Sequence, residues 1–259
     1  MTYEAIRLDI EGPLATITLN RPERLNASSQ QMVDEIADAL DHLGGARAVV
    51  ITGAGRAFCA GADMQTTGQD DSPGDTIYRR LSRHYSATLL KLSRLHVPVI
   101  TAVNGPAVGM GCSLALCGDL VIASENAFFL QGFVNVGLAA DGGASWLLPR
   151  LVGRSRAMEM MLLGERVSAR QAVEWGMIYK CADAESFTDE TRTLALRLAN
   201  GPTLAIATVR RQVAAALESS FANALLAEAE GQRDAMVTWD AAEGRRAFIE
   251  KRQPLFEGR

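Results

Sequence analysis

Hydrophobic and polar residues alternate along the first half of the chain in the patterns of strands and helices. Ile6–Ile10 and Leu14–Leu19 show a period of two on either side of a Glu-Gly-Pro turn, which predicts a β-hairpin. The short apolar runs Ala48–Thr52 and Val97–Val103 have the length and composition of buried strands. The chain therefore supplies several strands before residue 104.

Between these strands, apolar residues recur every three or four positions and predict helices. One stripe consists of Met32, Val33, Ile36, Ala39 and Leu40. Ser28 and Gln31 precede it with the spacing of a capping box, so we expect Ser28 to be the N-cap. Tyr78–Leu95 has the same helical spacing. The polar, turn-rich Gln65–Asp75 is expected to form a mobile loop.

After about Thr188 the pattern changes, and only helices are predicted, the last over Asp240–Glu250. Before that point strands, loops and helices alternate, which favours an α/β layered fold. We expect a boundary near Ala199–Pro202. It would separate an α/β core of residues 1–199 from a helical region of residues 200–259, which packs on its own core or on a neighbouring subunit.

Composition narrows the class of protein. The chain has 259 residues, of which 48% are hydrophobic and 22% charged, as in soluble globular proteins. A net charge of −4 provides no basic field for nucleic acid or anionic membranes. The absence of a signal segment and of a membrane-length apolar run predicts a cytoplasmic protein. Reduced, mostly buried thiols and no metal site are expected from the cysteines, Cys59, Cys112, Cys117 and Cys181.

The glycine-rich stretch Asn104–Asp119 carries candidate chemistry. The Gly-Met-Gly triplet at residues 109–111 is expected to open a helix. The first N–H groups of a helix have no internal partner and attract an anion, although such a triplet also suits a helix packed closely on a strand. The small residues of Phe58–Asp63 would let backbone approach a ligand. The alternative there is a tight turn in which Asp63 caps a helix.

A lone acidic residue, Asp141, precedes two glycines and an apolar run. With its carboxylate in an apolar pocket, it could move a proton while the glycine-rich turn stabilises an oxyanion. Burial would raise its pKa and a nearby helix start would lower it, so the sequence leaves the sign of the shift open. The alternative is that Asp141 is only an N-cap.

Five segments in the same order resemble the crotonase superfamily, also called enoyl-CoA hydratase/isomerase, and the resemblance covers essentially the whole chain. They are Asn20–Asn26, Phe58–Asp63, Pro98–Asp119, Gly137–Arg150 and Ala247–Arg252. The resemblance implies an α/β spiral of ββα units followed by a helical trimerisation region. It also implies acyl-CoA thioester substrates, no separate cofactor, and a homotrimer or a dimer of trimers.

The resemblance further implies roles for single residues. The backbone N–H groups of Ala62 and Met110 would form an oxyanion hole, in agreement with the reading of both segments. Phe248 matches a residue that lines the pocket. Lys251 matches a lysine that reaches the CoA phosphates from a neighbouring subunit, and the alternative is a solvated cationic helix end. Residues in segments that hold the nucleotide or pantetheine are Arg24, Leu25, Ala60, Asp63 and Met64.

Two departures from the family pattern bear on the reaction. Family hydratases use two glutamates, and the matching positions here are Ser113 and Phe133. Serine is a poor base at neutral pH and phenylalanine cannot take a proton, so two-glutamate hydration is not expected. Gly137–Asp141 resembles dienoyl-CoA isomerases, which usually carry further carboxylates. Asp141–Arg150 is closer to the ring-epoxide isomerases of phenylacetyl-CoA breakdown.

We therefore expect an acyl-CoA isomerase. Its candidate catalytic groups are Asp141 as acid and base, the oxyanion donors Ala62 and Met110, and Ser113 with a modest effect. The substrate would be a 3-enoyl-CoA or a ring-epoxide acyl-CoA. One alternative is a hydratase in which Asp141 activates water. Another is a CoA-ester- or RNA-binding relative with little catalysis, against which the acidic balance and the retained aspartate argue.

Overall fold

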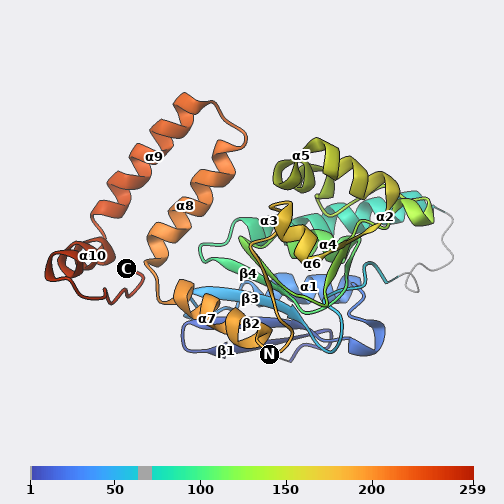
Figure 1. Ribbon diagram of the computed structural model, residues 1–259, viewed down its shortest axis with the longest axis horizontal. Helices are drawn as coiled ribbons and strands as arrows, with labels where there is room; N and C mark the ends of the chain where they lie inside the picture. The colour runs from blue at the N-terminus through green and yellow to red at the C-terminus, as the bar shows by residue number, and fades with distance from the viewer. Residues whose placement is uncertain (1, 64–71) are drawn as a thin grey trace.

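The computed structural model describes residues 2–63 and 72–259, and within them two sheets enclose a shared hydrophobic core (Figure 1). The larger sheet has the order β1-β2-β3-β4-β6-β9 and the smaller one β5-β7-β8. Their bounds are Ile6–Glu11 (β1), Leu14–Leu19 (β2), Ala48–Gly53 (β3), Val99–Val103 (β4), Ala107–Val108 (β5), Leu120–Ser124 (β6), Phe128–Leu130 (β7), Arg166–Ser168 (β8) and Lys180–Ala182 (β9).

From β4 onward, each turn of the chain adds one strand to each sheet. β4 is followed by β5 in the small sheet, β6 is followed by β7, and β8 precedes β9. From β2 to β9 the neighbours in the larger sheet are parallel. β1 and β2 form the predicted antiparallel hairpin, with Ile6 opposite Leu19. This arrangement confirms the expected α/β spiral.

The central strands are apolar on both faces because both faces are covered. Val49 and Ile51 of β3 point into the core between the sheets, whereas Val50 belongs to a second cluster on the outer face. There α7 (Phe187–Ala199) packs with Phe187 and Ala195. Parallel strands buried in this way appear in sequence as continuous apolar runs, which is the pattern that predicted them.

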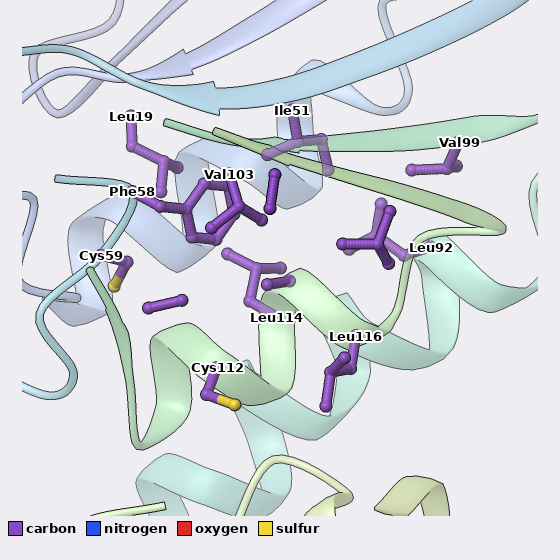
Figure 2. Packing of buried hydrophobic residues seen from close by; sticks show 14 of the residues in the cluster. Leu19, Ile51, Phe58, Cys59, Leu92, Val99, Val103, Cys112, Leu114 and Leu116 are labelled. Atoms are coloured by element: carbon purple, nitrogen blue, oxygen red, sulfur yellow. The ribbon is translucent and has the colours of Figure 1, made fainter. Parts of the chain in front are cut away.

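The core between the sheets also contains cysteines. Figure 2 shows Phe58, Val103 and Leu114 gathered at its centre, with Cys59 and Cys112 nearby. Burial raises the pKa of the Cys59 thiol to about 11 and that of Cys112 to about 12. Both thiols are therefore protonated at neutral pH and inert, as expected for core cysteines.

The prediction that Ser28 caps the first helix is wrong by one residue. α1 (Gln30–Ala39) has Ser29 as its N-cap, and the Ser29 Oγ accepts a hydrogen bond from the Met32 N–H at 3.1 Å. Ser28 instead pairs like a strand residue. Its N–H donates to the Gly61 carbonyl at 2.7 Å, and its carbonyl accepts from the Asp63 N–H at 3.0 Å. The predicted buried stripe of α1 is confirmed.

The helical segment predicted at Tyr78–Leu95 is present but starts earlier. It consists of α2 (Pro73–Arg80), a π-helical turn (Leu81–Tyr85) and α3 (Ser86–Ser93). Residues 73–75 of the predicted loop therefore belong to α2, because proline is tolerated in the first helical turn, where its missing N–H costs nothing. Residues 65–71 of that loop lie outside the described residues.

Three helices form an arm that extends away from the sheets (Figure 1). They are α8 (Thr203–Ala216), α9 (Phe221–Met236) and α10 (Trp239–Glu250). Arg210 of α8 pairs with Asp119 at 2.6 Å, and the Arg47 Nε donates to the Thr203 Oγ1 at 2.8 Å. The arm thus begins just after the boundary predicted at residues 199–202, although the division into domains stays a prediction. Within the described ranges, no helix has the length and apolar character needed to span a membrane.

Candidate functional site

Two backbone segments run side by side toward one end of the small sheet. Cys59 and Ala107 form a parallel bridge. The Cys59 N–H donates to the Pro106 carbonyl at 3.0 Å, and the Val108 N–H donates to the Cys59 carbonyl at 2.9 Å. Three residues beyond the bridged pair, the two segments reach Ala62 and Met110. Their register therefore brings the two predicted oxyanion donors to the same end.

Close packing at Gly111 sets the distance between these segments. A Cβ atom at Gly111 would lie 2.3 Å from the Cys59 carbonyl oxygen, so only glycine lets α4 (Met110–Leu116) begin there. The close packing that the Gly-Met-Gly triplet predicted is thus confirmed, whereas anion binding at this helix start stays a prediction. Within the described residues, neither the Ala62 N–H nor the Met110 N–H donates a hydrogen bond.

The turn at residues 141–143 presses against the first turn of α4. The Ser113 hydroxyl donates to the Asp141 carbonyl at 3.1 Å. A Cβ atom at Gly142 would lie 2.7 Å from the Met110 Sδ. These contacts bring Met110, Ser113 and Asp141 together around one helical turn, next to the segment that carries Ala62.

Asp141 is not an N-cap. α5 (Ala144–Leu163) has Gly143 as its N-cap, with no side-chain capping bond. The Asp141 Oδ1 is buried and has no hydrogen-bond partner among the described residues. Burial raises the pKa of this carboxyl from 3.8 to about 6, so the sign that the sequence left open is upward. The carboxylate keeps a negative charge at neutral pH but holds a proton more tightly than usual.

Phe133 lies over the start of α4, just before the 3₁₀ turn Val134–Val136. Its ring carbons would lie 3.4 to 3.7 Å from a Cβ atom at Gly109, so the ring covers that glycine. Ser113 is on the same helix and is fully buried. Neither a serine nor a phenylalanine side chain can serve as a carboxylate base.

Two of the segments predicted to hold CoA, those that contain Leu25 and Ala60, lie side by side. The Ala60 N–H donates to the Leu25 carbonyl at 3.0 Å, and Arg24 is exposed at the end of the 3₁₀ turn Pro22–Arg24. Asp63 is buried and forms an ion pair with Arg21 at 2.9 Å. Its carboxylate therefore helps to hold the fold. The remaining predicted residue of this group, Met64, lies outside the described residues.

Phe248 and Lys251 are not near this site within one chain. Figure 1 shows α10 at the end of the arm, far from α4 and α5. Phe248 is 85% exposed on α10, and Lys251 is the exposed residue that ends the helix. The structure thus separates the two predicted C-terminal residues from Asp141 in the single chain.

Sequence reasoning did not assign a role to Asn26, which supports the Ala62 segment. Its side-chain nitrogen donates to the carbonyls of Ala54 and Ala57 at 2.9 and 2.8 Å, and its oxygen accepts from the Arg21 N–H at 2.9 Å. Asn26 is fully buried and has a left-handed backbone (φ 56°). The only signal in the sequence was its place at the end of the Asn20–Asn26 motif.

A two-sheet spiral that ends in a helical arm is the architecture of the crotonase class. Residues 9–259 match the model of a family described as enoyl-CoA hydratase/isomerase. The chain belongs to this family of enzymes.

Individual relatives carry two kinds of name. The chain is 40% identical to the 1,2-epoxyphenylacetyl-CoA isomerase of Escherichia coli K12 over 99% of each chain. It is 41% identical to a Rhodobacter capsulatus protein named "Probable enoyl-CoA hydratase" over 100% of each. The crystal structure of an enoyl-CoA hydratase from Bacillus anthracis superposes with a TM-score of 0.93 at 28% identity, covering 99% of this chain and 100% of that one. The names therefore leave the particular reaction open.

Proposed function

We propose that this protein is an acyl-CoA isomerase that converts 3-enoyl-CoA to 2-enoyl-CoA with Asp141 as its acid and base. The observation that carries this proposal is the half-buried Asp141 carboxylate, whose Oδ1 has no hydrogen-bond partner in the described chain. The main-chain carbonyl of the same residue accepts a hydrogen bond from Ser113 in the first turn of α4. The two positions that could supply further acids hold Ser113 and Phe133. One carboxylate suits a reaction that takes a proton from one carbon and returns it to another.

In the proposed mechanism, the thioester oxygen accepts hydrogen bonds from the N–H groups of Ala62 and Met110. The Asp141 carboxylate takes a proton from C2, and the electron pair of that C–H bond moves toward the thioester oxygen. The same carboxyl then returns the proton to C4 while the double bond forms between C2 and C3. Backbone donors aimed at the developing charge lower the barrier, and a positioned carboxyl of suitable pKa carries the proton.

The pH dependence of the rate should report the Asp141 carboxyl. Because it must be deprotonated to accept the C2 proton and its pKa is about 6, we expect kcat/KM to fall about tenfold per pH unit below that value. Above pH 7 the rate should level off. Initial rates of conjugated product formation between pH 4.5 and 8.5 would test this. A fall in kcat/KM that begins only near pH 4 would contradict burial of the reacting carboxylate.

The reaction itself is tested by incubating the protein with a 3-enoyl-CoA in deuterated water and measuring the masses of the products by mass spectrometry. We expect a conjugated 2-enoyl-CoA of unchanged skeleton that has gained deuterium. A 2-enoyl-CoA that gains one heavy water in a parallel incubation would instead identify a hydratase in which Asp141 activates water. No change with the 3-enoyl-CoA would contradict double-bond isomerisation.

A second candidate is the rearrangement of a ring-epoxide acyl-CoA. It is favoured by the 40% identity to the Escherichia coli protein named 1,2-epoxyphenylacetyl-CoA isomerase. Here the Asp141 carboxylate would take a proton from the carbon next to the thioester and return it to a ring carbon while the epoxide opens and its oxygen enters the expanded ring. The oxyanion donors would keep the same role. Incubation with the ring-epoxide thioester distinguishes the two substrates, and inactivity toward both would favour a CoA-ester-binding protein.

We also propose that the arm, residues 200–259, joins copies of this chain into a homotrimer or a dimer of trimers. Support comes from large apolar side chains that are exposed on it, including Phe221, Val237 and Ile249. Exposed apolar surface of this extent is typical of a protein interface. Within such an assembly, Phe248 and Lys251 would reach the CoA of a neighbouring subunit.

A further inference from the structure

We propose that Ser113 is a positioning residue: its hydroxyl holds the turn at residues 141–143 so that the Asp141 carboxylate points at the acyl carbons. This proposal rests on the proposed function of Asp141 and assigns Ser113 no proton transfer. It replaces the sequence-based expectation that Ser113 has only a modest effect.

The Asp141 carboxylate depends on its backbone for its direction. In the described parts of the chain, no hydrogen bond or ion pair ends on either carboxylate oxygen, and Oδ1 is buried. Catalytic carboxylates are commonly oriented by a partner that bonds to one oxygen. With no such partner here, the position of the Asp141 main chain has to fix where its side chain points.

Within the described residues, two hydrogen bonds to the Asp141 carbonyl hold that main chain. The Asp141 carbonyl accepts from the Ala144 N–H at 3.2 Å, which closes the turn onto α5. It also accepts from the Ser113 hydroxyl at 3.1 Å, which ties the turn to α4. Only the second bond comes from a side chain, and Ser113 is 0% exposed, so water does not compete for it.

Packing at Gly142 brings the turn close against the helix. Gly142 has a left-handed backbone (φ 63°), and a Cβ atom there would lie 2.6 Å from the Ser113 Cβ and 2.7 Å from the Met110 Sδ. Met110 and Ser113 are three residues apart and so lie on one face of α4. The same turn of α4 therefore carries a proposed oxyanion donor, Met110, and contacts the turn that carries the proposed acid, Asp141.

The identity of residue 113 follows from these contacts. A larger side chain would have to displace the turn at Gly142, whereas alanine would fit but would leave the Asp141 carbonyl without its bond to α4. Serine is small enough for the space and still donates a hydrogen bond. The resemblance places a proton-transferring glutamate at this position in family hydratases. In this chain we propose that Ser113 instead holds the main chain of Asp141.

The test compares Ser113→Ala with Ser145→Ala. Ser145 is exposed at the start of α5, and its hydroxyl makes no hydrogen bond within the described residues. For Ser113→Ala we expect kcat to fall about 10- to 100-fold, because a shift of about 1 Å in a reacting group has effects of this size. KM should change less than about threefold, since groups that bind the substrate are untouched. Ser145→Ala should match the wild type.

The acid limb of kcat/KM is the readout that separates positioning from a general loss of structure. Met110, Ser113 and Ala144 contact the turn, and none of them titrates near neutral pH. A loosened turn lets the Asp141 carboxylate move toward water, so in Ser113→Ala the limb should shift below pH 6. If Ser113→Ala does not fold, Ser113→Cys, with a weaker donor, should give an intermediate kcat and the same direction of shift.

A wild-type kcat and an unmoved limb in Ser113→Ala, or in Ser113→Cys where that variant is the one that folds, would overturn the positioning role. The proposed function would survive that result as long as Asp141→Asn is inactive. Full activity of Asp141→Asn would instead overturn the proposed function. The two failures are therefore distinguishable in one set of variants.

Discussion

The Asp141→Asn variant is expected to lose nearly all isomerase activity, with kcat lowered by about a thousandfold or more. Asparagine has the shape of aspartate but cannot accept the C2 proton. The thioester would still bind, because Ala62, Met110 and the CoA segments are unchanged, so the dissociation constant of a saturated acyl-CoA should stay within about threefold of the wild type. Stopped product assays and calorimetric titration measure the two quantities separately.

The same variant is expected to be more stable than the wild type at neutral and alkaline pH. The carboxyl has a pKa of about 6 in the folded protein, above its ordinary 3.8, so the folded state holds the proton more tightly. Its contribution to stability is fully present below pH 4 and is lost as the pH rises through 6. Asparagine avoids the buried charge and, allowing for partial exposure, should gain about 1–2 kcal/mol at pH 8.

Thermal unfolding at pH 4 and pH 8 would show this as a difference in Tm between variant and wild type that is larger at pH 8. Asp9→Asn is the matched control, because Asp9 is exposed on β1 and should show neither change. An Asp141→Asn protein that is inactive and also less stable at pH 8 would indicate that the charge is paired in solution.

Local sequence patterns were enough to predict much of the fold. The hairpin of β1 and β2 and the buried stripe of α1 follow from periodicity within ten or so residues. Ser28 was wrongly predicted to be the N-cap of α1, because its backbone partners are Gly61 and Asp63, more than 30 residues away in the chain. A capping motif is a pattern of four neighbouring residues, so it carries no information about pairing with a segment that is distant in the sequence.

The candidate site shows the same limit. The resemblance selected Ala62 and Met110, but the bridge of Cys59 to Ala107, 48 positions apart, is what brings their segments together. Whether Asp141 caps α5 or faces an apolar site depends on the packing of Gly142 against α4, which no local pattern encodes. The upward shift of the Asp141 pKa is likewise a consequence of tertiary burial.

The Met110→Pro variant is expected to lower kcat about 100- to 1,000-fold relative to Met110→Ala, because it deletes one oxyanion donor. Met110 is the first residue of α4, where proline is well tolerated. Its N–H donates no hydrogen bond within the described residues, so proline, compared with alanine at the same position, removes the group that is proposed to bind the thioester oxygen. This substitution therefore tests a backbone role that side-chain changes cannot reach.

Met110→Ala is the necessary reference because both variants lose the same side chain. Met110 is 3% exposed and clusters with Val33 and Tyr85, so truncation should cost about 2–5 kcal/mol of stability in either variant. Only the N–H then distinguishes the two proteins in kcat, measured well below their unfolding temperatures. Equal kcat values would remove Met110 from the oxyanion hole and leave the charge on the thioester oxygen to Ala62 and other donors.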